Sequence, residues 1–362
     1  INSGNRDIFL AKALPSGIWE WGARVSGTQS ESGSQLALDP CGNVFLTGLY
    51  SSSPVSFFSR IDEGDLSGDF QFSLINPNPV ELSSTDIFLA KAFPSGIWEW
   101  GARISGMAFE TSSRIIVDSC GSAYLTGIYV STTLSFFNGI SEGDPGSSNL
   151  EFSLINSGDS DVFLAKALPS GIWEWGSRVA GVDNDRVRQL AISPCGAVYL
   201  TGTYESNPIS FFPGIRNGDP GIVEQQFSLP NTDTDMENSD IFLAKATPDG
   251  VWDWGARVAG AEVENVPQFA VDPCGTVYLT GTYTSDQVSF YPGRRTGDPV
   301  QVDPQFSLTD FGSFGTNVNE NIFLAKALSS GHWEWGARVS AEDAFFPMVS
   351  LDPCGAVYLT GS

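Results

Sequence analysis

Apolar and polar residues alternate along short segments of the chain, and a period of two predicts β-strands. In the segment 18–25, Trp19, Trp21, Ala23 and Val25 fall on one predicted strand face. Further apolar segments of strand length occupy residues 8–14, 35–38 and 43–50. No segment has the 3.6-residue period of an amphipathic helix. The pattern therefore predicts an all-β protein.

Tight turns separate these predicted strands. Pro15-Ser16-Gly17 follows the first segment, and its length suits a three-residue hairpin loop. Asp39-Pro40-Cys41-Gly42 precedes the last segment, with Pro and Gly where a type I turn with a Gly bulge prefers them. Strands joined by such turns run antiparallel. We expect at least four antiparallel strands in this part of the chain.

The same pattern recurs five times. The motif Asp-Ile-Phe-Leu-Ala-Lys-Ala, or a close variant, begins at Asp7, Asp86, Asp161, Asp240 and Asn321. The predicted units are 7–85, 86–160, 161–239, 240–320 and 321–362, the last one incomplete. Repeated four-stranded units favour a β-propeller of five blades, because blades packed around an axis leave few open sheet edges. A β-solenoid and a segment of a larger ring are the alternatives.

Each of the first four units also carries an extension, which we expect to form a further hairpin or a long edge loop. It begins at Ser-Phe-Phe (Ser-Phe-Tyr in the fourth) and ends at Phe-Ser-Leu. The fifth unit stops before this segment, at Leu359-Thr360-Gly361. An unfilled strand position at the edge of a sheet can pair with a strand of a neighbouring molecule. Head-to-tail assembly is one expectation, and a continuation of the chain beyond this sequence is the other.

The repeated motifs resemble a known family. Asp-Ile-Phe-Leu-Ala-Lys-Ala-x-Pro-Ser-Gly-x-Trp and Leu-Ala-x-Asp-Pro-Cys-Gly-x-Val-Tyr-Leu-Thr-Gly look like the SBBP-type β-propeller repeat of bacterial surface, secreted and viral proteins. The similarity covers the four core strands of each unit. It implies a propeller fold and no particular enzymatic activity. The cysteine in the turn and the length of the Phe-rich extension depart from the family pattern.

The negative net charge limits the classes of molecule that the chain is expected to bind. The formal net charge is −24, with 18 Lys and Arg against 42 Asp and Glu, so nucleic acid is not an expected partner. No apolar segment is long enough to span a membrane, and we expect no membrane insertion. The first residue is Ile rather than Met, which suggests a processed chain or a fragment. We expect an extracellular or cell-surface location, the surface of a virion included.

A cation and an anion recur at fixed places in the first hairpin of each unit. If the three-residue loop sets Leu14 opposite Ile18, Lys12 faces Glu20. The same count gives five structural ion pairs: Lys12–Glu20, Lys91–Glu99, Lys166–Glu174, Lys245–Asp253 and Lys326–Glu334. Such cross-strand pairs each contribute about 0.2–1 kcal/mol. Catalysis by these residues is the alternative, and it is disfavoured because tuned active-site groups need asymmetric surroundings.

Two tryptophans also recur in each unit, and we expect both on one strand face. They are Trp19 and Trp21, Trp98 and Trp100, Trp173 and Trp175, Trp252 and Trp254, and Trp333 and Trp335. Large rings of this kind pack between sheets by default. Stacking on sugar rings is the functional alternative, and five copies would then give a multivalent carbohydrate-binding protein for surface glycans.

Every unit has one cysteine, and all five occupy the same turn: Cys41, Cys120, Cys195, Cys274 and Cys354. Equivalent turns on different blades lie too far apart for a disulfide within the chain. We consider three states for these side chains: buried small apolar groups, intermolecular disulfides and exposed reactive thiols. Burial is the first expectation, and the odd count keeps the intermolecular disulfides open.

Candidate catalytic or metal-binding residues are few. The acidic stretch Asp233, Asp235 and Glu237 could hold calcium through oxygen ligands, although it lacks the spacing of an EF-hand loop. We predict no cofactor and no catalytic residues. His332 is the only histidine, and no nucleophile stands beside it.

These observations favour a non-enzymatic structural or interaction protein that self-associates into a filament or surface layer. A lectin-like propeller is the alternative. A glycosidase is disfavoured, because its carboxylates would be individual rather than repeated.

Overall fold

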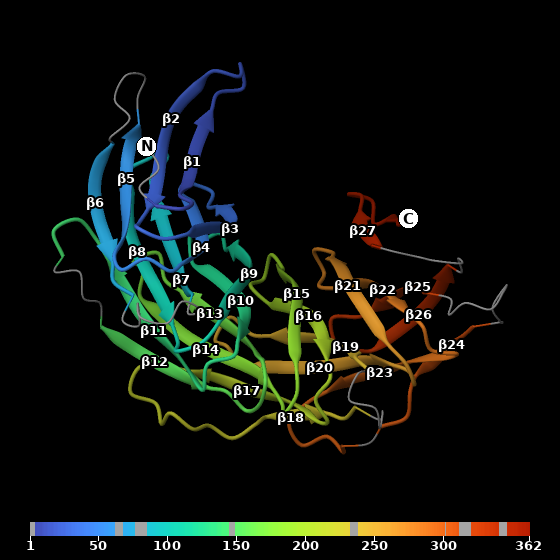
Figure 1. Cartoon of the computed structure of the whole chain (residues 1–362). Coiled ribbons are helices and arrows are strands. Elements are labelled where there is room, and N and C mark those ends of the chain that lie inside the picture. The colour runs from blue at the N-terminus through green and yellow to red at the C-terminus, as the bar shows by residue number, and fades with distance from the viewer. Residues whose placement is uncertain are drawn as a thin grey trace. The chain divides into compact units, whose positions relative to one another are not determined.

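The computed structural model describes residues 4–61, 68–76, 85–144, 149–231, 238–300, 302–310, 320–339 and 346–362. These residues form 28 β-strands and no helix, and most of the strands are labelled in Figure 1. The all-β prediction is confirmed. The chain divides into two compact units. Unit 1 comprises Ile1–Asn156, Phe163–Gly176 and Ile215–Ile222, and unit 2 comprises Ser157–Val162, Ser177–Gly214 and Val223–Ser362.

The strands follow the sequence repeat as three kinds of hairpin, which we call the first, second and third hairpin of a copy. The first hairpins are β1 (Ile8–Ala13) and β2 (Trp19–Ser26), β7 (Asp86–Ala92) and β8 (Trp98–Ser105), β13 (Asp161–Ala167) and β14 (Trp173–Ala180), β19 (Asp240–Ala246) and β20 (Trp252–Ala259), and β25 (Asn321–Ala327) and β26 (Trp333–Val339).

The second hairpins contain the cysteine turns. They are β3 (Glu31–Leu38) and β4 (Val44–Tyr50), β9 (Glu110–Val117) and β10 (Ala123–Tyr129), β15 (Asp185–Ile192) and β16 (Val198–Tyr204), β21 (Glu264–Val271) and β22 (Val277–Tyr283), and β27 (Met348–Leu351) and β28 (Val357–Thr360).

The extensions form the third hairpins. Of the two forms expected from the sequence, a further hairpin or a long edge loop, the hairpin is the one that the structure has. They are β5 (Val55–Ile61) and β6 (Asp69–Leu74), β11 (Thr133–Ile140) and β12 (Leu150–Ile155), β17 (Ile209–Ile215) and β18 (Phe227–Leu229), and β23 (Gln287–Arg294) and β24 (Phe306–Thr309). The two strands of each pair run antiparallel.

The sheets do not coincide with the sequence copies, because a six-stranded sheet combines hairpins of consecutive copies, and we call this offset the stagger. In unit 1, one six-stranded sheet has the order β12-β11-β8-β7-β4-β3, so the second hairpin of copy 1 pairs with the first hairpin of copy 2. In unit 2, the order β15-β16-β19-β20-β23-β24 repeats this arrangement with copies 3 and 4. The expectation that the four core strands of one copy form one blade is therefore wrong. The stagger arises because β4 pairs with β7 along seven residues, from Val44 opposite Ala92 to Tyr50 opposite Asp86.

Three further sheets are smaller. The first, β1-β2-β5-β6 in unit 1, contains a first and a third hairpin and no second one. In unit 2, the sheet β21-β22-β25-β26 contains a second and a first hairpin, and β27-β28 is a second hairpin by itself. These sheets have the strand order of the six-stranded ones with part of the set missing.

The turns form as the sequence predicts. The Leu14 amide donates to the Ile18 carbonyl at 2.8 Å, and Gly17 has a φ of +83°, which glycine adopts without strain. In the cysteine turn, the amides of Cys41 and Asn43 both donate to Oδ1 of Asp39 at 2.9 Å. This side-chain acceptor explains why Asp recurs at the first turn position.

Aromatic side chains of the third hairpins fill the core between sheets. Phe57 of β5 stacks on Phe72 of β6 with ring centroids 4.7 Å apart, and its ring meets Phe88 and Trp98 edge-on. In unit 2, Phe290 repeats these contacts with Phe306, Phe323 and Trp333. The third hairpin is therefore part of the core rather than a surface addition.

Candidate functional site

The five Lys–acid pairs form in the structure. The N–O distances are 2.9, 2.8, 2.7, 2.9 and 2.6 Å for the pairs in copies 1 to 5. The strict register that led to these pairs is wrong, however. A β-bulge lies at this point of the first hairpin, so that Lys91 faces Trp100 and Ala92 faces Trp98, with Glu99 as the extra residue. The long side chains bridge the offset.

The bulge also corrects the prediction that both tryptophans share one strand face. Lys91 and Ala92 are consecutive in β7, so their side chains and those of the paired tryptophans point to opposite faces of the sheet. The Nε1 of Trp98 donates to the Phe58 carbonyl at 3.2 Å, and that of Trp100 donates to the Pro169 carbonyl at 2.9 Å. The pair therefore joins its sheet to two different neighbouring segments.

Eight of the ten tryptophans are buried. The exceptions are Trp19, 70% exposed, and Trp335, 37% exposed. Trp98, Trp173, Trp252 and Trp333 occupy the position of Trp19 and are at most 2% exposed. Packing is therefore the use of these rings in the interior copies. A sugar could stack on these buried rings only by displacing their contacts with neighbouring strands. The buried tryptophans therefore do not provide the repeated sugar site that the carbohydrate-binding alternative needs.

The cysteines are all exposed and free, and the expectation of burial is wrong. The cause is the turn itself, because its backbone amides point inward to the aspartate and the side chain of the third residue points outward. In copy 3, serine replaces the aspartate, and the Ser193 hydroxyl lies 3.1 Å from the Cys195 sulfur. This contact lowers the pKa of the Cys195 thiol. The two remaining sequence-based states, exposed thiols and intermolecular disulfides, both require this exposure.

A buried carboxyl pair was missed at the sequence level. Asp86 begins β7 and Glu110 begins β9, and both side chains are fully buried. The Ser131 hydroxyl donates to Oε1 of Glu110, and the Tyr50 hydroxyl donates to Oδ2 of Asp86 at 3.4 Å. Arg103 also interacts electrostatically with Asp86. The signal was present in the sequence, since an acid stands at the same interval after the first-strand Asp in each of the first four copies.

Burial dominates the electrostatics of this pair. Removal from water raises the pKa of Glu110 to about 8, with the Ser131 hydrogen bond opposing and the Asp86 charge adding to the rise. The pKa of Asp86 rises to about 6, again because of burial, against the opposing effects of Ser105 and Arg103. Near neutral pH, the Glu110 carboxyl is therefore mostly protonated rather than an anion.

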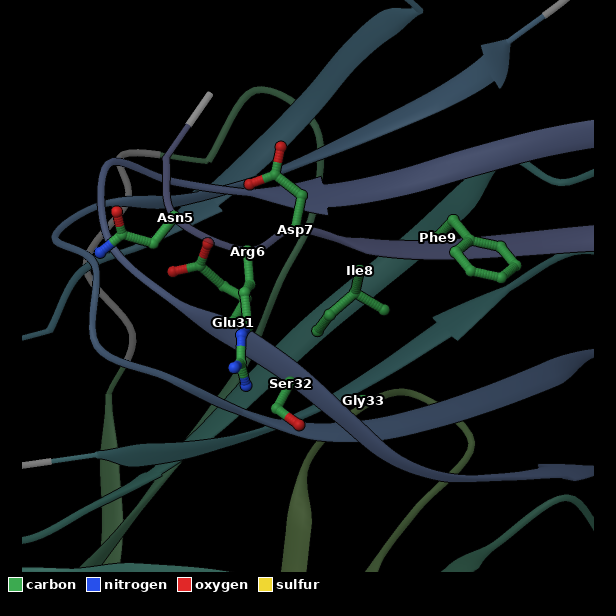
Figure 2. A pocket seen from close by; sticks show the side chains of 8 residues that line it. All are labelled: Asn5, Arg6, Asp7, Ile8, Phe9, Glu31, Ser32 and Gly33. Carbon is green, nitrogen blue, oxygen red and sulfur yellow. The ribbon is translucent and has the colours of Figure 1, made fainter. Parts of the chain in front are cut away.

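The equivalent pair of copy 1 lines a cavity of about 540 Å³. Figure 2 shows its lining residues from β1, β3 and the segment before β1: Asn5, Arg6, Asp7, Ile8, Phe9, Glu31, Ser32 and Gly33. Burial raises the pKa of Glu31, and the Ser52 hydroxyl donates to this carboxyl at 2.5 Å. A carboxyl that lines a cavity could exchange a proton with a ligand. The same arrangement recurs with buried acids in copies 2 to 4, which fits a structural role for the pair.

The other candidates give no site in the described residues. The acidic stretch Asp233, Asp235 and Glu237 lies outside them. His332 contacts Gln305, whose Nε2 lies 2.7 Å from the imidazole Nε2. Within the described ranges, no group of three or more His, Cys, Asp or Glu side chains could hold a metal ion. The described part of the chain also contains no helix of the length and apolarity that a membrane span needs.

Taken together, the strands and their repetition define an all-β repeat protein whose antiparallel sheets fit a β-propeller. No protein-family model matches the chain. The chain is similar to an uncharacterized WD repeat-containing protein of Acanthamoeba polyphaga mimivirus, L264. The two are 26% identical over an alignment of 371 residues that covers 93% of the chain. The chain matches 25% of the length of that relative.

Proposed function

We propose that this chain is a non-enzymatic repeat scaffold that associates with further copies through open strand edges. The observation that carries the proposal is the set of incomplete sheets. Among the described strands, the sheet β1-β2-β5-β6 contains no second hairpin, β27-β28 pairs with no first hairpin, and β26 pairs with no third hairpin. Open strand edges are templates for further pairing.

The chemistry of the repeat supports a structural role. Each Lys–acid pair, each tryptophan pair and each turn cysteine has equivalents in the other copies. A catalytic centre usually depends on individual groups in asymmetric surroundings. Here burial raises the pKa of Glu110 to about 8 and that of Asp185 well above its ordinary value, and these two residues are equivalents in two copies.

Five blades remain the proposed number for the propeller. One complete blade would contain a first, a second and a third hairpin, as the six-stranded sheets do. The five first hairpins then count five blades. Pairing of a second hairpin of one molecule with a first hairpin of the next, in head-to-tail order, would give a filament or a layer.

Molecular mass and particle shape test the proposal. We expect the mass from light scattering to rise with protein concentration, and negative-stain electron microscopy to show filaments or regular arrays. The exposed turn thiols allow a second comparison, since assemblies held by intermolecular disulfides would dissociate with reductant. A monodisperse monomer of 38.8 kDa at all accessible concentrations would contradict self-association.

A further inference from the structure

The chain passes from one sheet to another between the first and the second hairpin of a copy. In copy 2, β8 lies in the six-stranded sheet that ends at β3, whereas β9 pairs with β10 in a different sheet. Thr85 and Phe109 form an isolated parallel bridge at this junction. Asp86 begins β7 on one side of the junction, and Glu110 begins β9 on the other. The buried acid pair therefore lies where the two hairpins meet.

The pair in copy 2 is closely packed and incompletely hydrogen-bonded. A Cβ on Gly106, in the loop between β8 and β9, would lie 2.5 Å from Oε1 of Glu110 and would also collide with the Ser131 hydroxyl. The same hydroxyl donates to Oε1. Among the described residues, Oε2 of Glu110 and Oδ1 of Asp86 have no hydrogen-bond partner. A buried carboxylate oxygen without a donor is costly, so this site suits a neutral acid better than an anion.

The neighbouring charges also disfavour a second anion. After burial and the opposing Ser131 bond, the Asp86 charge from β7 contributes to the raised pKa of Glu110. Arg103 of β8 acts on Asp86 in the opposite direction, and the Tyr50 hydroxyl of β4 donates to it at 3.4 Å. With both acids ionised, repulsion between the two carboxylates would oppose the attraction of Arg103.

The other strands that pack against β9 present uncharged groups. These strands are β3 and β10, in addition to β4 and β7. Tyr129 of β10 faces Glu110 in the register, and its hydroxyl donates to the Ile155 carbonyl at 3.2 Å. Gln35 of β3 accepts a hydrogen bond from the Ile115 amide at 2.8 Å. The charges that act on the pair therefore come from the first hairpin of the same copy.

Copy 3 repeats this arrangement, and copy 4 changes it. Asp185 at the start of β15 is buried, and its Oδ1 has no hydrogen-bond partner in the described part of the chain. Burial, and after it the Asp161 charge, raises the pKa of Asp185 well above its ordinary value. In copy 4, the Gly260 amide donates to Oε2 of Glu264 at 2.7 Å and the Ser285 hydroxyl donates to Oε1 at 2.6 Å. Both oxygens of Glu264 thus have donors, which accommodates an anion.

We propose that the acid pairs of copies 2 and 3 are pH-operated latches between the first and the second hairpin. With the acid at the start of β9 or β15 protonated, the junction is closed. Ionisation draws the carboxylate toward water and opens the start of the second hairpin. The junction of copy 4 stays closed, because the Glu264 carboxylate has its donors in place. The latch lies within one molecule, so it operates whether or not molecules associate.

The direction of the switch follows from proton binding. The closed junction raises the pKa of Glu110 from 4.5 to about 8, and exposure to water returns it toward 4.5. Between these values the closed form binds a proton more tightly than the open form does. Opening therefore becomes easier as the pH rises toward 8, and acid closes the latch.

Hydrogen exchange followed by mass spectrometry on the full chain tests the latch at the level of single strands. After correction for the intrinsic exchange rate, we expect the protection of β9 and β15 to fall by at least about tenfold between pH 6 and pH 8. The protection of β21, in copy 4, and of β5, in the same unit as β9, should change by less than about threefold.

Glu110→Gln should abolish the fall in protection at β9 and leave the fall at β15 unchanged. Glu142→Gln, which removes an equal charge from an exposed side chain, is the matched control and should behave like the parent chain. Asp86→Asn is the second variant, for the case that Glu110→Gln changes the circular dichroism. Because it removes the charge that contributes to the raised pKa of Glu110, it should make the fall at β9 smaller.

Three results would overturn the latch. The first is protection of β9 that does not change with pH in the parent chain. The second is an equal loss of protection at β21 and β9, which would show general loosening of the fold. The third is a fall at β9 that persists in both Glu110→Gln and Asp86→Asn, which would assign the pH dependence to other groups.

Discussion

The buried carboxyl pair makes the stability of unit 1 depend on pH. Folding raises the pKa of Glu110 from its ordinary value of 4.5 to about 8, mainly by burial. Between these two values the folded protein binds a proton more tightly than the unfolded protein does. Stability is therefore greatest on the acidic side of this range and falls as the pH rises toward 8. Asp86, with its pKa raised to about 6, adds to the same trend at lower pH.

Replacement of Glu110 by glutamine should remove most of this dependence. A pKa difference of one unit corresponds to about 1.36 kcal/mol, so between pH 5 and pH 8 the Glu110 carboxyl costs the folded state about 3 kcal/mol. Glutamine cannot ionise, and its amide oxygen can still accept the bond from Ser131. We expect Glu110→Gln to be more stable than the parent chain at pH 8 by about 2–3 kcal/mol. At pH 5 we expect the two to differ little.

Urea unfolding followed by tryptophan fluorescence at pH 5, 6, 7 and 8 measures this difference. Hydrogen exchange of β9 assigns it to the right place if the two units unfold separately. Glu142→Gln is the matched control, because it removes an equal charge from an exposed side chain. Parallel pH profiles for the parent chain and Glu110→Gln would refute the assignment of the pH dependence to the buried carboxyl.

Three further predictions follow from packing and exposure. Gly127→Ala should destabilise the protein by at least about 2 kcal/mol in urea unfolding, because its Cβ would lie 1.9 Å from the Thr111 carbonyl, and Gly221→Ala should be neutral. Trp98→Phe should lower the free energy of unfolding by about 1–3 kcal/mol, because it removes the hydrogen bond to the Phe58 carbonyl and part of the buried ring. Trp19→Phe, at the equivalent exposed position, should lower it by less than about 0.5 kcal/mol. Equal effects in urea unfolding would contradict the packing assigned to Trp98. A thiol reagent should titrate five cysteines in the reduced, folded protein before any denaturant is added, and a smaller number would show that some of these thiols are covered.

Local chemistry was predictable from the sequence wherever a short segment determines it. The turn at Pro15-Ser16-Gly17 is fixed by its length and its glycine, and it brings Lys12 and Glu20 close enough to pair although a bulge offsets their register. The core role of Trp98 was also the first expectation, since a large ring in a repeated strand is rarely left in water. These features depend on neighbours along the chain, which the sequence displays directly.

Features that depend on the pairing of distant strands were not predictable in the same way. The bulge at Glu99 changes the face of every residue on one side of it, and no residue type in the segment announces it. The stagger between sheets and copies depends on whether β4 pairs with β7, and the repeat motif reads the same in either case. Neither strand by itself indicates the carboxyl pair, because Asp86 and Glu110 lie in different hairpins, and the recurring interval between the two acids was its one signal in the sequence.

The stagger links the stability of one copy to that of the next. Because each complete sheet joins the second hairpin of one copy to the first hairpin of the next, consecutive copies are held by strand pairing as well as by packing. The Thr47 hydroxyl, which donates to the Phe88 carbonyl at 2.9 Å, and Gly48, which leaves room for the Phe88 ring, hold copy 1 to copy 2 in this way. The threonine and glycine of the second hairpin are therefore core residues of the next copy's sheet as well as of their own hairpin.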